Sequence, residues 1–134
     1  MARELKSGAH SVYSLRYKAV FTTNDCRELL TPDHIDLIRS TVEGFADDYG
    51  VVTVGIDGGR DHVQVDFEAE PTTDLAKFVN VVKGTTARRV RNEYGDELNV
   101  DLQQDSFWDE SYCLLSTGQV SIDTLSQYLQ QRRA

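Results

Sequence analysis

A strict two-residue alternation over residues 62–69 constrains the fold more than any other feature of this sequence. The polar positions of this segment are His62, Gln64, Asp66 and Glu68, and each is followed by an apolar residue. Because successive side chains of a strand point to opposite faces, the pattern predicts a strand with one face in a core and the other face polar. Residues 51–56 form a β-branched run before a glycine-rich turn, which predicts the preceding strand of a hairpin.

The other elements follow from periodicity and capping signals. Thr31-Pro32 predicts a helix start, with Thr31 as the cap and Pro32 at the first helical position. Residues 95–106 are acidic and have no assignable pattern. In chain order, the elements predicted around the hairpin are a strand over 11–21, a helix from Thr31 to Gly50, a helix over 73–93, a strand over 112–116 and a helix over 121–132.

This order of strands and helices predicts an α+β fold. Its first six elements match the ferredoxin-like arrangement, a four-stranded antiparallel sheet with two helices on one face. A chain of 134 residues without internal repeats or a linker is expected to form a single domain over residues 1–134. The last helix is then an addition to that domain.

The charge distribution limits where nucleic acid could bind. The net charge of −8 argues against general affinity, because phosphate binding requires lysine and arginine. The basic residues are concentrated, however, and residues 71–94 hold five basic and two acidic side chains within a mostly acidic chain. Any contact with nucleic acid is therefore expected to be local.

Cysteine usage and hydropathy predict the compartment. Cys26 and Cys113 are far apart and form no metal-binding motif, so neither a disulfide framework nor a zinc site is expected. No apolar run is long enough to span a bilayer, and no secretory signal precedes the first strand. We therefore expect a cytoplasmic protein with no membrane role.

The polar face of the 62–69 strand is the first candidate site. His62 and Gln64 project from the same face, and an imidazole nitrogen with an amide oxygen could ligate a divalent cation. Asp66 continues the same row. The alternative is the ordinary solvated face of an antiparallel sheet, which has the same pattern.

A basic helix segment and one tyrosine are the other candidates. Lys83, Arg88, Arg89 and Arg91 lie near one end of a predicted helix and could bind phosphate, although cations near a helix C-terminus are also common on solvated faces. Tyr128 lies at the edge of the last helix's apolar stripe, where an aromatic residue usually packs against the core. A phenol with a pKa near about 10 becomes an effective nucleophile only if a metal polarises the phosphate that it attacks.

Three single residues have simpler expectations. His34 falls in the first turn of a helix, where a cation is unfavourable, and is expected at the surface. Phe107 and Trp108 precede the last strand and are expected in the core, with stacking on nucleic-acid bases as the alternative.

Taken in order, several segments resemble one family, the single-tyrosine HUH (His, bulky apolar, His) transposases of small insertion sequences, which are also called TnpA-like. The resemblance covers nearly the whole chain. It is carried by HSVYSLRYKAVF, DHVQVDF, PTTDLAKFVNVVKGTTARRVR, SFWDESYCLLSTG and SIDTLSQYLQQR.

The resemblance implies a ferredoxin-like sheet with a mobile C-terminal helix, here residues 119–134, which Gly118 would link flexibly to the sheet. It implies action on hairpin-bearing single-stranded DNA, with Mg²⁺ or Mn²⁺ bound at the HUH motif and a tyrosine that forms a 5′-phosphotyrosine link. It also implies a homodimer with composite active sites. By position, the nucleophile maps onto Tyr128, the first metal-binding histidine onto His62, and a DNA-proximal helix onto Lys83, Arg88 and Arg89.

Two departures from the family pattern keep a second hypothesis open. Gln64 stands where the family has its second histidine, although an amide oxygen can still bind a cation. Arg132 stands where the family has a metal-binding glutamine, and an arginine cannot ligate a metal. Gln131 lies one residue before the position of the family's glutamine, so its side chain points about 100° away from that direction around the helix. With Asp66, Gln131 and Arg132 are auxiliary candidates.

The sequence therefore predicts a divergent transposase. One alternative is a catalytically inactive protein of the same family that binds nucleic-acid hairpins. Another is a dimeric ferredoxin-like domain with no nucleic-acid role.

Overall fold

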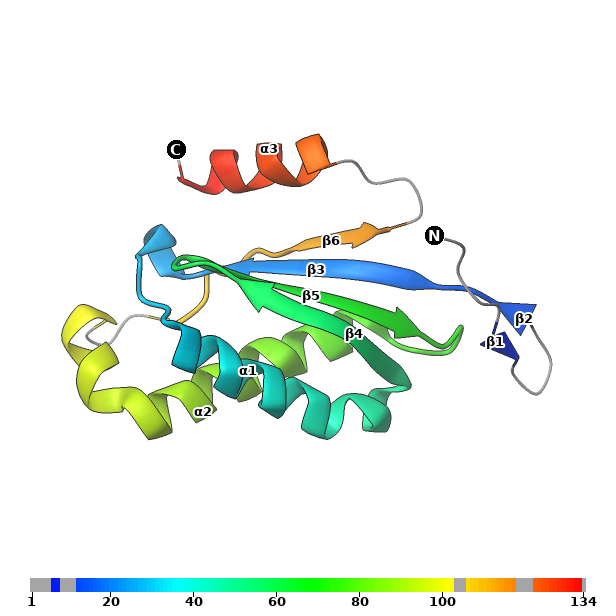
Figure 1. Cartoon of the computed structure of the whole chain (residues 1–134), viewed down its shortest axis with the longest axis horizontal. Helices are drawn as coiled ribbons and strands as arrows, with labels where there is room; N and C mark the ends of the chain where they lie inside the picture. The colour runs from blue at the N-terminus through cyan, green and yellow to red at the C-terminus, as the bar shows by residue number, and fades with distance from the viewer. Residues whose placement is uncertain (1–5, 8–11, 103–105, 118–121, 134) are drawn as a thin grey trace.

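The computed structural model describes residues 6–7, 12–102, 106–117 and 122–133. It is built in layers (Figure 1), with a four-stranded sheet in the middle, two long helices below it and the last helix above it. We call the face toward the two long helices the inner face and the opposite face the outer face. The predicted α+β architecture is confirmed.

The sheet is antiparallel and has the strand order β4-β5-β3-β6. The central strands are β3 (Arg16–Thr22) and β5 (His62–Ala69), and the edges are β4 (Val51–Gly58) and β6 (Cys113–Ser116). The alternation over 62–69 therefore predicts β5 with its observed bounds. Residues 11–21 form no single strand, because β2 (Val12–Tyr13) pairs instead with β1 (Lys6–Ser7) before β3 begins.

Register places the polar side chains together on the outer face. Val63, Val65 and Phe67 are at most 1% exposed and face the core with the two long helices. His62 is paired with Thr22 and Gln64 with Val20, so the outer face continues across β3. These paired residues carry the candidate site.

Helix α1 (Pro32–Phe45) begins as predicted. Thr31 is the cap, its side chain accepts from the backbone N–H of His34, and Pro32 is in the first turn. The imidazole Nδ1 of His34 accepts in return from the backbone N–H of Thr31 at 3.1 Å. This capping box holds His34 at 2% exposure against the ring of Tyr94, so the expectation of a surface histidine is wrong.

Helix α2 (Leu75–Leu102) is longer than predicted. The backbone bends at Tyr94 (φ −125°, ψ 23°), and the helix then continues through the acidic segment that has no sequence pattern. Leu98 is 2% exposed in this continuation and belongs to the core. Gly84 does not interrupt the helix.

The segment before β6 is anchored in the core. Phe107 and Trp108 are 2% and 6% exposed, as expected for core residues. The Trp108 indole N–H donates to Thr86 Oγ1 at 3.1 Å, and the backbone of Trp108 bridges to Thr23. This anchoring fixes the position of the residue that follows, Asp109.

Helix α3 (Ile122–Arg133) lies along the outer face over β6 and β3 (Figure 1). Val20 points to that face, since it is paired with Gln64 and Cys113, and it has no exposed surface. The link at Gly118 lies outside the described residues. Within the described ranges no helix is sufficiently long and apolar to cross a membrane.

Candidate active site on the outer face

The polar row of β5 is present, and it is partly occupied by contacts within the protein. His62 and Gln64 are half-buried on the outer face. Asp66 is engaged further along the row, because Arg16 forms a bidentate ion pair with it at 3.0 and 3.2 Å. We therefore place Asp66 outside the reactive part of the site.

His62 lies in a network with Asp61 and Arg133. The imidazole Nδ1 is 2.9 Å from Asp61 Oδ1, and the Arg133 guanidinium donates to both oxygens of the same carboxylate at 2.6 and 2.9 Å. The hydrogen bond from Arg133 is the main cause that lowers the pKa of Asp61 to about 2, and His62 contributes in the same direction against the effect of burial. The C-terminal end of α3 therefore lies at the His62 end of β5.

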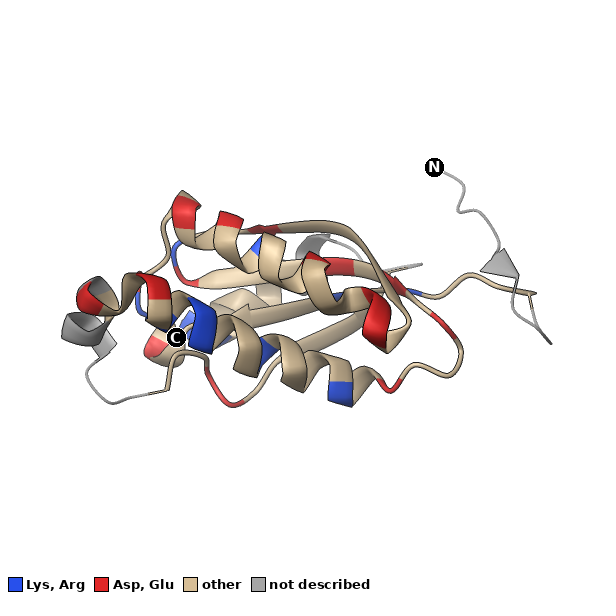
Figure 2. Cartoon of the chain, turned by 90° about the horizontal axis from the view of Figure 1, so that it is seen from below, with Lys and Arg blue, Asp and Glu red and all other residues tan. Residues whose placement is uncertain are grey.

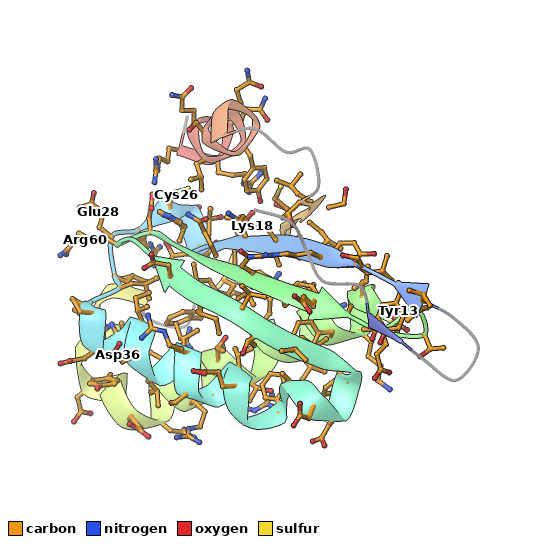
Figure 3. The ribbon with its side chains drawn as sticks, turned by 45° about the vertical axis from the view of Figure 1, so that its right-hand side comes forward. Tyr13, Lys18, Cys26, Glu28, Asp36 and Arg60 are labelled. Carbon is orange, nitrogen blue, oxygen red and sulfur yellow. The ribbon has the colours of Figure 1, made fainter. Side chains whose placement is uncertain are left out.

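A second arginine secures the same helix end. Arg132 forms an ion pair with Asp109 in the segment before β6. The Cys26 thiol donates to the backbone carbonyl of Arg132 at 3.0 Å, from a loop in which Asp25 and Cys26 have positive φ values of 56° and 53°. Figure 3 shows Cys26 between α3 and the sheet. Arg132 is thus occupied as an ion-pair partner.

Tyr128 points from α3 toward the sheet. Its hydroxyl is buried and has no hydrogen-bond partner among the described residues. Burial raises the pKa of Tyr128, and the neighbouring Cys113 raises it further, while Ser111 and Arg132 lower it by smaller amounts. In this conformation the phenol is held neutral and away from solvent, which is unfavourable for a nucleophile.

His62 and Gln64 offer two ligand atoms, which fits a divalent cation that binds to a protein through only one or two side chains. Among the described residues, no group of three or more His, Cys, Asp or Glu side chains could hold a metal ion. The Nδ1 atom of His62 is directed at Asp61, however, which leaves the lone pair of Nε2 available to ligate a metal ion. The side chain of Gln64, with its amide oxygen, projects from the same face. Mg²⁺ commonly binds through one or two protein ligands, with water and phosphate oxygens completing its shell.

The four basic candidates of α2 lie in the helix layer and have different environments. Figure 2 shows this layer from below, with the basic residues on α2 and mostly acidic residues on α1. Lys83 Nζ donates to the backbone carbonyls of Asp109 and Glu110 at 2.7 and 2.8 Å, and burial lowers its pKa. Arg88 and Arg89 are exposed, and Arg89 pairs with Glu93. Arg91 is half-buried.

A groove of about 580 Å³ runs beside the exposed part of this helix. Lys77 and Arg88 contribute cations to it, and Gly84 is among its lining residues. It is therefore an open, positively charged depression in the helix layer, separated from the His62 row by the sheet.

Sequence reasoning missed the acidic partners of the site. Asp61 directly precedes His62, and this adjacency is the one local signal that could have identified it. No local signal marks Arg133, Asp109 or Cys26, because each meets its partner through the packing of α3 onto the sheet. Gln131, the remaining auxiliary candidate, is exposed.

Comparison with known proteins gives consistent matches. The model of the IS200-like transposase family matches residues 11–132. The ISDra2 transposase TnpA of Deinococcus radiodurans is 25% identical over 129 residues, which cover 96% of this chain and 91% of that protein.

Two solved structures share the fold. A crystal structure from Deinococcus radiodurans R1, of a protein assigned as a transposase, has a TM-score of 0.86 and 25% identity, and the match covers 96% of this chain and 98% of that one. A REP-associated tyrosine transposase bound to a REP hairpin has a TM-score of 0.52 and 8% identity, over 95% of this chain and 66% of that one. The second likeness concerns the fold alone.

Proposed function

The chain belongs to the IS200-like transposase family, whose members process DNA, and we propose from this premise that it cleaves and rejoins single-stranded DNA at the ends of an insertion sequence. The observation that carries the proposal is the placement of the Tyr128 helix on the sheet face that presents His62 and Gln64. A phenol and two candidate cation ligands are thereby brought to one surface.

Tyr128 would act as the nucleophile. Its phenolic oxygen forms a bond to the scissile phosphorus, and the bond from phosphorus to the 3′ oxygen breaks. The phenol proton is lost to solvent, and the leaving 3′ oxygen takes up a proton to become a free hydroxyl. The strand is left as a 5′-phosphotyrosine, so the phosphodiester energy is kept for rejoining.

His62 and Gln64 would hold the divalent cation, Mg²⁺ or Mn²⁺. When bound, such an ion neutralises the charge that develops on the phosphate during attack. The Arg133 guanidinium borders the same imidazole at 3.5 Å from Nδ1 and adds a fixed positive charge at this end of the sheet.

The conformation described here would be a resting one. The Tyr128 hydroxyl is buried, so a phosphate can reach it only after α3 shifts. We propose that residues 119–134 move as a unit within a single-domain protein, and that a homodimer allows the helix of either copy to complete a site. The polar contacts at the end of α3 would then be broken and remade in each cycle.

The helix layer would bind the DNA. Arg88 is an exposed cation that lines the α2 groove, and Arg89, also exposed, and Arg91 lie on the same helix. The fold relative that is bound to a REP hairpin supports a folded single strand as the partner. Lys83 would act indirectly, by holding the segment that carries Asp109.

The chemistry is tested by trapping the intermediate. The protein is incubated with Mn²⁺ and labelled single-stranded DNA that carries candidate element ends, and the expected product is a covalent protein–DNA adduct. Tyr128→Phe should abolish the adduct, and Tyr112→Phe is the matched control. Absence of an adduct where an active relative forms one contradicts the proposal, and an adduct that survives Tyr128→Phe refutes the nucleophile.

A second candidate function is hairpin binding without catalysis. It is favoured by Arg132, which occupies the position of a family ligand and is bound to Asp109. Calorimetric titration with Mn²⁺ separates the two functions. Binding that is lost in His62→Ala supports the enzyme, whereas no detectable binding alongside tight, salt-sensitive hairpin binding supports the inactive alternative.

A further inference from the structure

Asp61 has a fixed position that the proposed chemistry does not yet use. It follows the turn between β4 and β5 and is 8% exposed. Its backbone carbonyl accepts hydrogen bonds from the backbone N–H of Thr23 at 2.9 Å and from Thr23 Oγ1 at 3.3 Å. The backbone of Asp61 is therefore held by the end of β3, independently of α3.

The carboxylate of Asp61 is shared by two partners. Oδ1 is 2.9 Å from His62 Nδ1 and 2.9 Å from Arg133 Nη2, and Oδ2 is 2.6 Å from Arg133 Nε. An ionised carboxylate can only accept hydrogen bonds, so its 2.9 Å contact favours a proton on Nδ1 over the longer 3.5 Å contact from Arg133 Nη2, which would need Nδ1 as the acceptor. The lone pair of His62 is then on Nε2, the nitrogen available to a cation.

We propose that Asp61 is the positioning residue of His62, and that Arg133 makes this positioning depend on the docking of α3. The inference rests on the proposed role of His62 as a cation ligand and adds two residues to it. Metal-binding histidines commonly donate their other N–H to a carboxylate, which fixes both the tautomer and the ring orientation. In this chain the same carboxylate is also the anchor of the tyrosine helix.

The consequence is a link between two parts of the site. While α3 is docked, Arg133 occupies both oxygens of Asp61 and lies 3.5 Å from the imidazole. When α3 leaves, the carboxylate loses its strongest partner and gains rotational freedom. The orientation of His62 is therefore best defined in the resting conformation, in which α3 is docked, and it becomes freer when α3 shifts.

The test measures the tautomer of His62 in the metal-free protein, by nitrogen NMR of ¹⁵N-histidine-labelled samples at about pH 8, above the usual titration range of histidine. His62→Gln assigns the signal. The wild type should show the Nδ1–H tautomer. Asp61→Asn should shift His62 toward the Nε2–H tautomer, because the amide would place its oxygen toward Arg133 and its N–H₂ toward Nδ1.

Asp66→Asn is the matched control for Asp61→Asn. It removes a carboxylate from the strand face that carries His62, but this carboxylate pairs with Arg16 and not with His62, so the His62 signal should not move. Arg133→Gln should move the signal toward an average of the two tautomers, and Arg132→Gln should not. Asp61→Asn should also weaken Mn²⁺ binding about 10–100-fold.

Persistence of the Nδ1–H tautomer in both Asp61→Asn and Asp61→Ala would overturn the role of Asp61. Identical His62 spectra for Arg133→Gln and Arg132→Gln would overturn the link to α3, and this comparison holds even if the Asp61 variants fail to fold. A protein that forms no DNA adduct can still pass both tests, so failure here is distinguishable from failure of the proposed function.

Discussion

Lys83 Nζ donates two hydrogen bonds to consecutive backbone carbonyls, those of Asp109 and Glu110. It also lies 5.9 Å from the centre of the Tyr112 ring. Since the segment around Asp109 has no helix or strand of its own before β6, these contacts fix a loop that faces the end of α3. A residue first considered as a phosphate ligand therefore has a clear structural role.

Lys83→Met should destabilise the protein by about 1–3 kcal/mol, because the two carbonyls lose their charged donor. The free energy of unfolding is measured by urea titration monitored by circular dichroism. Lys77→Met, at an exposed position of the same helix, should change it by less than about 0.5 kcal/mol. Equal effects for the two variants would contradict the structural role.

Tyr128 should titrate above its ordinary range in the folded protein. Its pKa is raised above 10, chiefly by burial. A group whose pKa is raised on folding stabilises the folded state below its unfolded pKa, and this contribution is lost as the pH rises through the folded pKa. We therefore expect alkaline pH to weaken the docking of α3.

The Tyr128 contribution is obtained by subtracting the tyrosinate absorbance of Tyr128→Phe from that of the wild type during an alkaline titration. Its midpoint should lie above pH 10. In the Arg133→Gln variant, where α3 loses its ion pair with Asp61 and Tyr128 keeps the Arg132 charge that lowers its pKa, the midpoint should return toward 10. A wild-type midpoint at or below 10 would contradict the burial of the hydroxyl.

At the scale of elements, the sequence predicts those features that depend on neighbouring residues alone. The alternation over 62–69 gave the bounds of β5, and the Thr31-Pro32 pair gave the start of α1, because periodicity and capping are properties of neighbouring residues. The continuation of α2 beyond Tyr94 was missed, since its core contact through Leu98 comes from tertiary packing. The ion pairs of Arg132 and Arg133 join distant segments and have no local pattern.

The cap of α1 offers a test at this scale. Thr31→Ala removes the side-chain acceptor for the backbone N–H of His34 and should lower the free energy of unfolding by about 1 kcal/mol. Thermal and urea unfolding measure the change. Ser40→Ala, at an exposed position in the same helix, is the control and should have an effect below about 0.5 kcal/mol. A neutral Thr31→Ala would show that the cap does not stabilise α1.

The whole molecule has two candidate functional surfaces with a sheet between them. The basic residues of α2 lie in the helix layer (Figure 2), and the His62 row lies on the outer face, which α3 with Tyr128 covers. If the proposed function holds, binding of the DNA and reaction at the phosphate are carried out on opposite sides of the protein. Variants on the two sides should then have different kinetic signatures.

Arg88→Ala/Arg89→Ala should weaken hairpin binding and should lower the slope of log affinity against log salt by about one per residue, because each substitution removes a cation that can release counterions. His62→Gln should instead lower the maximal rate of adduct formation. Fluorescence anisotropy at several salt concentrations and single-turnover kinetics measure the two effects. If the arginine variant lowered only the rate of adduct formation and His62→Gln weakened only hairpin binding, the division of surfaces would be refuted. If the arginine variant left the salt dependence unchanged, a domain without a nucleic-acid role would be favoured.

The cover that α3 gives to Val20 has a consequence for shortened forms of the protein. Val20 and Cys113 make the outer face of β3 and β6 apolar at its centre, so this sheet has hydrocarbon on both sides. A chain truncated after Thr117 would expose that centre to water, beside β6, which lies at an edge of the sheet that the described residues form. Such a fragment would be prone to self-association through its sheet, because exposed apolar surface next to a free strand edge favours intermolecular pairing.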